Sequence, residues 1–379
     1  MRGLYTEKVA PGKIPFGRLV REILEPGAGE AVSSRIREIG PTQDAYGRTS
    51  DVREPIRKAD ATDADEAAFL LGQIRETDSE SRAEESTDAP ETENTDILAE
   101  RFCDDGEGEV NRYNVYKITT EGKCYVLKKS DEAEIGVYER FLKGQGLPAP
   151  DYFGSARWGG KRWILIEYVP GTDLRDYTSD MALPCAESIS RIANRYWQED
   201  EAAFVRKKRD DRFERYWKRI NKRAECLKGE PVLKEAYDRF LERQLTCPRT
   251  LSNGDFLQFN AIFRDGKVTL VDWAFGGIMP YSLDIARMIA HGTEDRLTFP
   301  FYMTQAHKRL FVERTYELLE HKPPHERYLS DVRLAVLNEY IEFIESDLLD
   351  ASRARDQVFD YYYAGARKLA EEILGEDGT

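Results

Sequence analysis

The chain of 379 residues is poor in the side chains that bind metals through sulfur or nitrogen. Its five cysteines are scattered and never stand in C-x-x-C spacing, which is typical of reduced thiols in a cytosol and argues against a disulfide framework. Only four histidines are present, and a Pro-Pro pair between His321 and His325 interrupts the helix that would bring these two together. A zinc site is therefore not expected.

Long hydrophobic runs are also missing. No stretch approaches the 18 apolar residues that cross a bilayer, and the first twenty residues lack the apolar core of a secretory signal. We expect a cytoplasmic protein without membrane contact. With 41% hydrophobic residues the chain can still bury a large core, and its length favours two lobes.

The net charge of −14 is concentrated in one segment. Residues 60–100 carry fourteen acids against Arg75 and Arg82, a balance of −12, so the rest of the chain is close to neutral. This distribution argues against nucleic acid as a partner. Residues 77–97 have almost no apolar side chains to offset the loss of chain entropy, which predicts a disordered linker, placed at 77–100.

Residues 1–76 are predicted to form an N-terminal extension with two short amphipathic helices. Apolar residues at helical spacing lie within 14–24 and within 65–76. The two stripes consist of Phe16, Leu19, Val20, Ile23 and Leu24, and of Phe69, Leu70 and Ile74. Docking onto the main domain, or no role at all, is favoured over the alternative of a protein partner.

The chain changes character from about residue 101. Strand-like runs rich in aromatic and β-branched residues occur at 111–118, 124–129 and 162–169, and Glu121-Gly122 marks a tight turn between the first two. Beyond residue 185 the pattern is mainly helical. We therefore predict an α+β fold with a small β-rich N-lobe at 101–170 and a larger, mainly helical C-lobe at 171–379.

A helix is predicted directly after the second strand, with Ser130 as its N-cap. At 100° per residue, Glu134 falls near the centre of its apolar face, where a carboxylate needs a cation. Lys128 and Lys129 end the preceding strand, and a strand lysine paired with a helix glutamate holds nucleotide phosphates in kinases. We favour Lys128. Lys129 is the alternative, because neighbours on a strand point to opposite faces.

Two strand-like runs flank Asp265-Gly266, which predicts a two-residue hairpin. Counting outward from the turn, Asn260 and Asp272 meet at the open end of this hairpin. Two oxygen-bearing side chains there suit Mg²⁺, which prefers oxygen ligands and also binds substrate phosphates. Asp255 stands five residues before Asn260, in the D-x-x-x-x-N spacing of a catalytic loop whose acid accepts a proton from an attacking hydroxyl.

The motifs NGDFLQFN at 253–260 and LVDW at 270–273 resemble those of the aminoglycoside phosphotransferase and choline kinase-like family, which has a bilobal protein-kinase-like fold. WILIEYVPGTDL at 163–174 resembles the family's hinge between lobes. PYSLDIARMI at 280–289 resembles the segment in which an acid, here Asp284, braces the catalytic loop. The resemblance covers roughly residues 101–295, and Asn253 departs from it by replacing the usual histidine.

This resemblance implies transfer of the γ-phosphoryl group of ATP, or of GTP, to a hydroxyl of a small molecule. It implies that Asp255 is the catalytic base and that Asn260 and Asp272 bind Mg²⁺. The residues that it assigns to the nucleotide, as phosphate clamp, hinge backbone and glycine loop, are Lys128 with Glu134, Glu167 with Val169, and Gly106 with Gly108.

The sequence leaves two alternatives to phosphoryl transfer on a small molecule. A pseudokinase or interaction protein that only binds nucleotide is favoured by Asn253 and by an acidic glycine loop, but disfavoured by the intact catalytic motif. The acids of that loop are Asp104, Asp105, Glu107 and Glu109. A protein kinase is disfavoured because the stretch after Asp272 leaves little room for an activation segment.

The acceptor is poorly defined by the sequence. Residues 206–223 are distinctly basic, which would suit an acidic or phosphorylated acceptor. A solvated helix face with i, i+4 ion pairs is the favoured interpretation of this run.

Overall fold

The computed structural model describes residues 2–9, 16–24, 97–106, 109–198, 211–350, 352 and 355–375. The chain divides into two compact units, one formed by Met1–Lys129 with Phe153–Leu165 and the other by Ser130–Tyr152 with Ile166–Thr379. The first is built on a β-sheet and the second is mainly helical, so the predicted α+β fold class is confirmed. The helix predicted at 65–76 and residues 77–96 of the predicted linker lie outside the described residues.

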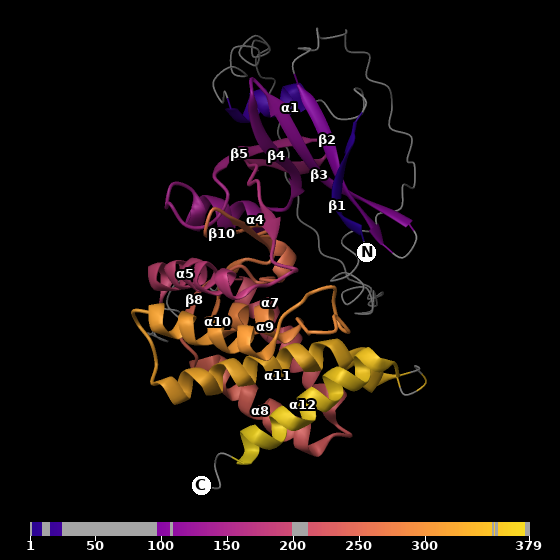
Figure 1. Ribbon diagram of the computed structural model, residues 1–379, viewed down its shortest axis with the longest axis vertical. Helices are drawn as coiled ribbons and strands as arrows, with labels where there is room; N and C mark the ends of the chain where they lie inside the picture. Colours follow the sequence, from indigo (N-terminus) through magenta and orange to yellow (C-terminus); the bar gives the residue numbers. More distant parts are fainter. Residues whose placement is uncertain are drawn as a thin grey trace, which may run out of the picture. The chain divides into compact units, whose positions relative to one another are not determined.

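A six-stranded sheet in the order β1-β2-β3-β4-β6-β5 dominates the first unit (Figure 1). Its strands are β1 (Arg2–Lys8), β2 (Leu98–Gly106), β3 (Glu109–Thr120), β4 (Lys123–Ser130), β5 (Tyr152–Trp158) and β6 (Lys161–Glu167). The three strands expected from the sequence are β3, β4 and β6, and the expected turn at Glu121-Gly122 joins β3 to β4 with positive φ at both residues. Strands β1, β2 and β5 were not foreseen, and β2 begins inside the segment assigned to the linker.

Helix α1 (Phe16–Leu24) packs its apolar face against this sheet. Phe16, Leu19, Val20 and Ile23 are buried, as the predicted stripe requires, whereas Leu24 is 38% exposed. The ring of Phe16 lies 5.1 Å from that of Tyr116 on β3. The amphipathic face of this helix is therefore satisfied within the chain itself.

Strand β1 completes the edge of the sheet from a distant part of the sequence. It pairs antiparallel with β2, with Lys8 opposite Glu100, although residues 9–97 separate the two strands. An exposed ion pair between Glu7 and Arg112 on β3 adds to this connection. The extreme N-terminal segment is thus part of the sheet rather than a separate appendage.

The second unit contains helices α4, α5 and α7 to α12 with several short strands. Its helices are α4 (Glu132–Val137), α5 (Ser179–Tyr196), α7 (Asp211–Arg223), α8 (Pro231–Thr246), α9 (Ser282–Ala290), α10 (Gln305–Leu318), α11 (His325–Leu349) and α12 (Gln357–Gly375), with shorter turns η1 (Tyr138–Leu142), η2 (Ala224–Leu227) and η3 (Gln258–Asn260). Its strands are β7 (Thr172–Asp173), β8 (Arg249–Ser252), β9 (Ala261–Arg264), β10 (Lys267–Leu270) and β11 (Gly277–Pro280).

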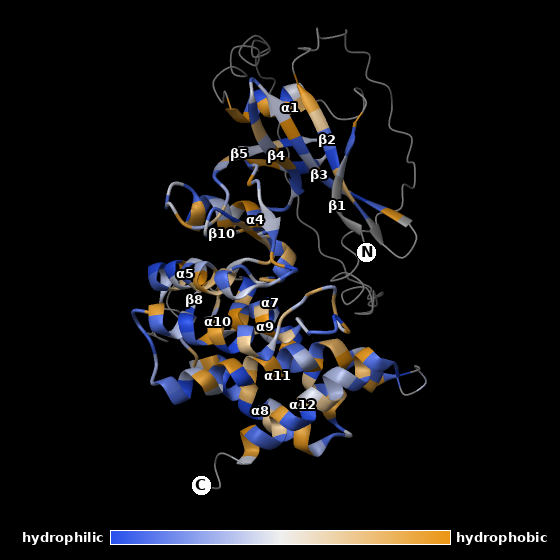
Figure 2. Cartoon of the chain, in the orientation of Figure 1, coloured by the Kyte–Doolittle hydropathy of each residue, from blue (hydrophilic) through white to orange (hydrophobic). Residues whose placement is uncertain are grey.

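Long amphipathic helices build the core of this second unit. Helix α5 packs against α10 and β8, while α11 packs against both α9 and α12. Hydrophobic and hydrophilic residues are mixed along α11 and α12, as expected for helices with one buried face (Figure 2). Of the helices described, none combines the length and the hydrophobicity that a membrane span requires.

The helix after β4 begins differently from the prediction. Its N-cap is Asp131, whose carboxylate accepts a hydrogen bond from the Glu134 amide at 2.8 Å, so the assignment of Ser130 as N-cap was wrong. Asp131 has the extended backbone that an N-cap residue requires. Its negative charge also interacts favourably with the positive end of the helix dipole. After Val137 the helix continues as the π-helical turn η1.

Candidate active site

The hairpin between β9 and β10 has the predicted register. Asp265 and Gly266 form its two-residue turn with φ values of 50° and 72°, and the strand residues pair as counted outward from this turn. One position beyond the ladder, the Val271 amide donates to the Asn260 carbonyl at 2.9 Å. Asn260 and Asp272 therefore lie at the open end of the hairpin, as expected from the sequence.

The loop before the hairpin is braced by Asp284 from α9. One carboxylate oxygen accepts from the Ser252 hydroxyl at 2.7 Å and from the Gly254 amide at 3.0 Å, and the other accepts from the Asn253 amide at 2.7 Å. This confirms the bracing role implied for Asp284. Burial raises the pKa of Asp284 to about 6, against the opposing effect of these hydrogen bonds.

Gly254 is required by the close approach of the loop to the chain after Asp272. Its φ is +78°, and a Cβ at this position would lie 2.2 Å from the main-chain oxygen of Phe275. Any side chain would therefore push apart the two segments that carry Asp255 and Asp272.

Asn253 connects these same segments through its side chain. Its Nδ2 donates to the carbonyls of Val271 at 3.2 Å and of Asp272 at 3.0 Å, and its Oδ1 accepts from the Asp255 amide at 3.3 Å. The residue is fully buried. The architectural connection at this position therefore does not need a histidine.

Asp255 is held on both sides of its carboxylate. Asn260 Nδ2 donates to Asp255 Oδ2 at 2.9 Å and to the Asp255 carbonyl at 2.8 Å. Arg287, on α9, donates to Asp255 Oδ1 from Nε at 3.1 Å and from Nη2 at 2.9 Å. Because both partners of the Asn260 amide nitrogen are acceptors, the amide orientation is determined, and its Oδ1 is the oxygen available to a cation.

The environment of Asp255 makes it a stronger base than an ordinary aspartate. Burial raises the pKa of Asp255, and the carboxylates of Asp272 and Glu339 act in the same direction. The guanidinium of Arg287 opposes them. A raised pKa favours proton uptake, which a general base requires.

Asp272 adopts a backbone conformation that is uncommon for a residue with a side chain. Its φ is +54°, its side chain is exposed, and Oδ1 accepts from the Ala274 amide at 3.4 Å. Non-glycine residues in this region of backbone space gather at functional sites.

The donor set fits Mg²⁺ that is shared with a polyphosphate. Asn260 Oδ1 and the Asp272 carboxylate are hard oxygen donors, the type that Mg²⁺ selects. In the part of the chain that the structure describes, no group of three or more acidic, histidine or cysteine side chains could hold a metal ion by itself. Phosphate oxygens and water would therefore have to complete the octahedral shell.

Glu134 is buried, as the helical pattern predicted. It is 1% exposed, and its Oε2 accepts from the Ser130 hydroxyl at 2.7 Å. Burial is the main cause that raises the pKa of the Tyr138 hydroxyl, and the negative charges of Glu134 and Asp272 raise it further. The charges of both carboxylates thus act on one buried phenol of the second unit.

Lys128 and Lys129 belong to the first unit, whereas Glu134 belongs to the second. Both lysines are half-buried near the end of β4. Lys128 lies opposite Val115 in the ladder and, by alternation, on the face opposite the buried Leu127. Gly106 is the last residue of β2, and Gly108 lies outside the described residues.

The predicted hinge begins where β6 ends. The Glu167 amide donates to the Asp151 carbonyl at 2.8 Å, and the Asp151 amide donates to the Glu167 side chain at 3.2 Å. The amide of Glu167 is therefore engaged within the second unit.

The basic run is only partly a solvated face. Residues 206–210 lie outside the described ranges, and the remainder belongs to α7. Lys218 and Glu214 form an exposed i, i+4 pair, as expected. Arg223, however, is 2% exposed and pairs with Glu342 at 2.8 Å and Glu345 at 3.0 Å on α11. That part of the run stabilises the core.

Sequence reasoning missed three residues, Arg287, Glu339 and His291, that extend a chain of contacts from Asp255. Arg287 bridges Asp255 and Glu339, and the buried His291 contacts Glu339 at 3.1 Å. The available signal was the spacing of polar residues 284, 287 and 291 on the otherwise apolar helix α9 and its C-cap. Spacings of three and four place these residues on one helix face.

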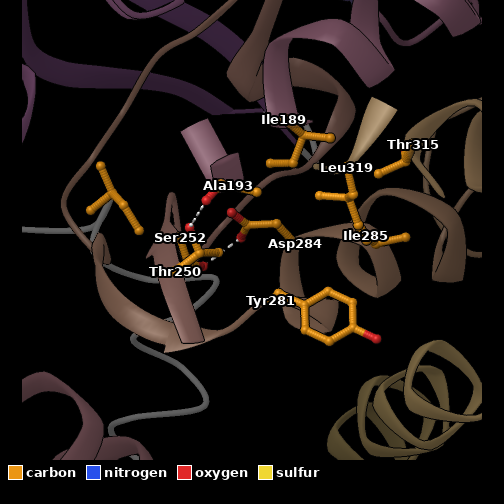
Figure 3. A pocket seen from close by; sticks show the side chains of 10 residues that line it. Ile189, Ala193, Thr250, Ser252, Tyr281, Asp284, Ile285, Thr315 and Leu319 are labelled. Carbon is orange, nitrogen blue, oxygen red and sulfur yellow. Dashed lines mark hydrogen bonds between the residues drawn. The ribbon is translucent and has the colours of Figure 1, made fainter. Parts of the chain in front are cut away.

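A small cavity lies behind the catalytic loop. Thr250, Ser252, Tyr281 and Asp284 border it together with apolar side chains from neighbouring helices (Figure 3). Its volume of about 10 Å³ accommodates roughly one water molecule. Binding pockets for small molecules are far larger, of the order of 300–1,000 Å³. This space is therefore a packing void of the core and not the acceptor site.

A sequence profile of the phosphotransferase enzyme family, APH, matches residues 105–319. Among solved structures, the chain is similar to an ethanolamine kinase of Plasmodium vivax (12% identity, 73% of this chain and 83% of that one, TM-score 0.47). It is also similar to an amicoumacin kinase solved with AMP-PNP, Ca²⁺ and amicoumacin (15%, 70% and 85%, TM-score 0.47). A third similar structure is a choline kinase from Cryptosporidium parvum (15%, 76% and 91%, TM-score 0.43). Among curated proteins, no sequence matches significantly.

The family match covers more than half of the chain and includes the whole hairpin region. The protein belongs to the phosphotransferase enzyme family, which confirms the family resemblance inferred from the motifs.

Proposed function

We propose that the protein transfers the γ-phosphoryl group of ATP, or of GTP, to a hydroxyl group of a small molecule. The observation that carries this proposal is the fixed carboxylate of Asp255 beside the paired oxygen donors Asn260 and Asp272. Family membership supports phosphoryl transfer in general. The local geometry supports the roles of the individual residues.

In the proposed reaction, Asp255 orients the acceptor hydroxyl and takes its proton on Oδ2. The acceptor oxygen forms a bond with the γ-phosphorus while the bond from that phosphorus to the β-γ bridging oxygen breaks, and the nucleoside diphosphate leaves. The proton leaves Asp255 for solvent after the product departs. General-base assistance of this kind contributes typically about 10²–10⁴-fold in rate.

Asn260 and Asp272 would hold Mg²⁺, which would supply positive charge to the phosphates as they separate. Lys128 is proposed as the phosphate-binding lysine, because its side chain is on the strand face opposite the core around Leu127. Glu134 would pair with this lysine. The backbone of Glu167 and Val169 is proposed to contact adenine, and the loop with Gly106 and Gly108 to cover the phosphates.

The charges of the second unit do not favour a polycationic acceptor. Three acids on α11 pair with arginines of the same unit: the buried Glu339 with Arg287, and the partly exposed Glu342 and Glu345 with Arg223. Acids that are already paired offer little attraction to an amine-rich ligand. We therefore define the acceptor by its hydroxyl group and not by its charge.

The test compares wild type with Asp255→Asn. Thermal shift with MgATP and MgGTP measures nucleotide binding, and ADP or GDP release over a panel of hydroxylated metabolites measures transfer. We expect Asp255→Asn to bind nucleotide like wild type while turnover falls about 10²–10⁴-fold. Asp265→Asn, in the exposed hairpin turn, is the matched control and should leave turnover unchanged.

The outcomes separate transfer from simple binding. Unchanged turnover in Asp255→Asn would refute the assignment of the base. Metal-dependent nucleotide binding by wild type, without release stimulated by any acceptor, would favour the rival function of a nucleotide-binding pseudokinase.

A further inference from the structure

A continuous chain of polar contacts runs from Asp255 into the interior of the second unit. The guanidinium of Arg287 donates to Asp255 Oδ1 from two nitrogens, and its third nitrogen, Nη1, donates to Glu339 Oε2 at 2.7 Å. The side chains of Arg287, Asp255 and Glu339 are 11%, 18% and 7% exposed. The carboxylates of Asp255 and Glu339 thus both accept hydrogen bonds from the largely buried guanidinium of Arg287.

The two oxygens of Asp255 are left in different states by these contacts. Oδ1 accepts two N–H groups from Arg287, which occupies both of its lone pairs. Oδ2 accepts one N–H group, from Asn260 at 2.9 Å, and keeps one lone pair. Oδ2 is therefore the oxygen that can accept a further proton.

Glu339 is itself held by a second buried contact. His291 Nε2 lies 3.1 Å from Glu339 Oε2, and His291 Nδ1 lies 2.8 Å from the Tyr362 hydroxyl on α12. A carboxylate can only accept, so Nε2 carries the proton and the Tyr362 hydroxyl donates to Nδ1. Helices α9, α11 and α12 thereby determine where the Arg287 guanidinium stands.

We infer that Arg287 is a positioning residue for the catalytic base: anchored by Glu339, it saturates Oδ1 of Asp255 and turns Oδ2 toward the acceptor hydroxyl. This inference rests on the proposed function, because it assigns a direction to the base proposed there. Two guanidinium nitrogens hold Oδ1 in place, and together with Asn260 on Oδ2 they restrict rotation of the carboxylate. Without Arg287, the described side-chain hydrogen bonds to this carboxylate would be reduced to the one from Asn260 to Oδ2.

A structurally similar pair elsewhere serves as the control. Arg243 on α8 makes a two-point contact with the buried Asp331 on α11, at 2.6 and 2.8 Å. Arg243 contacts none of the proposed catalytic residues in any described hydrogen bond or ion pair. Loss of this pair should lower stability without changing the turnover of the folded protein.

The experiment measures MgATP hydrolysis, with water as the acceptor, by the full chain. The variants are Asp255→Asn, Arg287→Gln, Arg287→Lys, Arg243→Gln and the double variant Asp255→Asn/Arg287→Gln. We expect Arg287→Gln to lower kcat about 10- to 100-fold with the KM for MgATP within about threefold of wild type. Arg287→Lys, which keeps the charge but makes one contact, should recover part of the loss.

The double variant distinguishes positioning from a purely structural role. If Arg287 acts only through Asp255, adding Arg287→Gln to Asp255→Asn should lower kcat no further. Multiplied losses, or an unchanged kcat in Arg287→Gln while Asp255→Asn is impaired, would overturn the inference and leave the proposed function standing. An unimpaired Asp255→Asn would instead overturn the proposed function.

A second variant keeps the inference testable where Arg287→Gln folds poorly. Glu339→Gln retains the shape of the anchor but weakens its hold on the guanidinium, and it does not touch Asp255. A fall in kcat at constant KM for MgATP supports the inference. A kcat equal to that of wild type, measured on folded Glu339→Gln, contradicts it.

Discussion

The side-chain amide of Asn253 donates to the main-chain carbonyl of Asp272 at 3.0 Å. Through this bond Asn253, the first residue of the NGD motif, holds the backbone of Asp272, which is a proposed metal ligand. The bond requires an N–H donor at the right distance and not a titratable ring, so asparagine can make this architectural contact.

We predict that Asn253→Ala lowers both stability and turnover. Two buried carbonyls would lose their donor, at a cost of about 1–3 kcal/mol, and Asp272 would no longer be held in place. Asn253→His should retain most activity. Urea unfolding and ADP release measure the two effects.

Asn194→Ala is the matched control, because this amide also bridges main-chain groups, donating to Leu318 and accepting from Glu320. It should lower stability alone. Equal losses of turnover in both variants would argue against the proposed role of Asn253.

A second prediction concerns the backbone of Asp272, whose φ is +54°. Glycine tolerates this conformation better than any other residue, so Asp272→Gly should keep or raise the free energy of unfolding, by up to about 1 kcal/mol. The same change should abolish the thermal shift caused by MgATP. Asp265→Gly, at φ 50° in the exposed turn, relieves the same strain and should leave the MgATP shift intact.

If the shift survived in Asp272→Gly, this carboxylate would not be a metal ligand.

The third prediction uses a buried lysine outside the proposed site. Lys308 on α10 is 8% exposed, and burial lowers the pKa of its ammonium to about 8, from an ordinary value of 10.5. The unfolded chain binds the proton more tightly, so folding is penalised below pH 8 and the penalty fades as the pH rises from 8 to 10.5. Lys308→Met should therefore stabilise the protein by up to about 3 kcal/mol at pH 7.

Urea unfolding of wild type and Lys308→Met at pH 7 and pH 10.5 provides the measurement. The advantage of the variant should shrink at the higher pH, while Lys218→Met, at a 74% exposed side chain, should give little change at either pH. A gain that is independent of pH would show that packing, and not charge, explains the effect.

Local signals account for what the sequence predicted correctly. Asp265-Gly266 between two apolar runs determined the hairpin and its register, since a turn of this type joins residues that are adjacent in sequence. The apolar stripe of α1 and the burial of Glu134 likewise follow from helical spacing within one short segment. These features need no knowledge of distant partners.

The features that were missed depend on partners far away in the chain. Strand β1, RGLYTEK, has no clear alternation of apolar and polar residues, and it pairs with β2, which lies about ninety residues further on. The position of Arg287 depends on its contact with Glu339, which is 52 residues further on and belongs to another helix. Ser130 and Asp131 are adjacent, and both are residue types that commonly cap helices. Helix ends are rarely defined to better than one or two residues, so the sequence could not decide between them.

The pairing of β1 with β2 has a consequence for how the protein is made. Residues 2–8 leave the ribosome long before residues 98–106, so the edge of the first sheet cannot close until most of that unit has been synthesised. A bulky tag fused at residue 1 would stand beside an outer strand whose loss would expose β2 to pairing with other molecules.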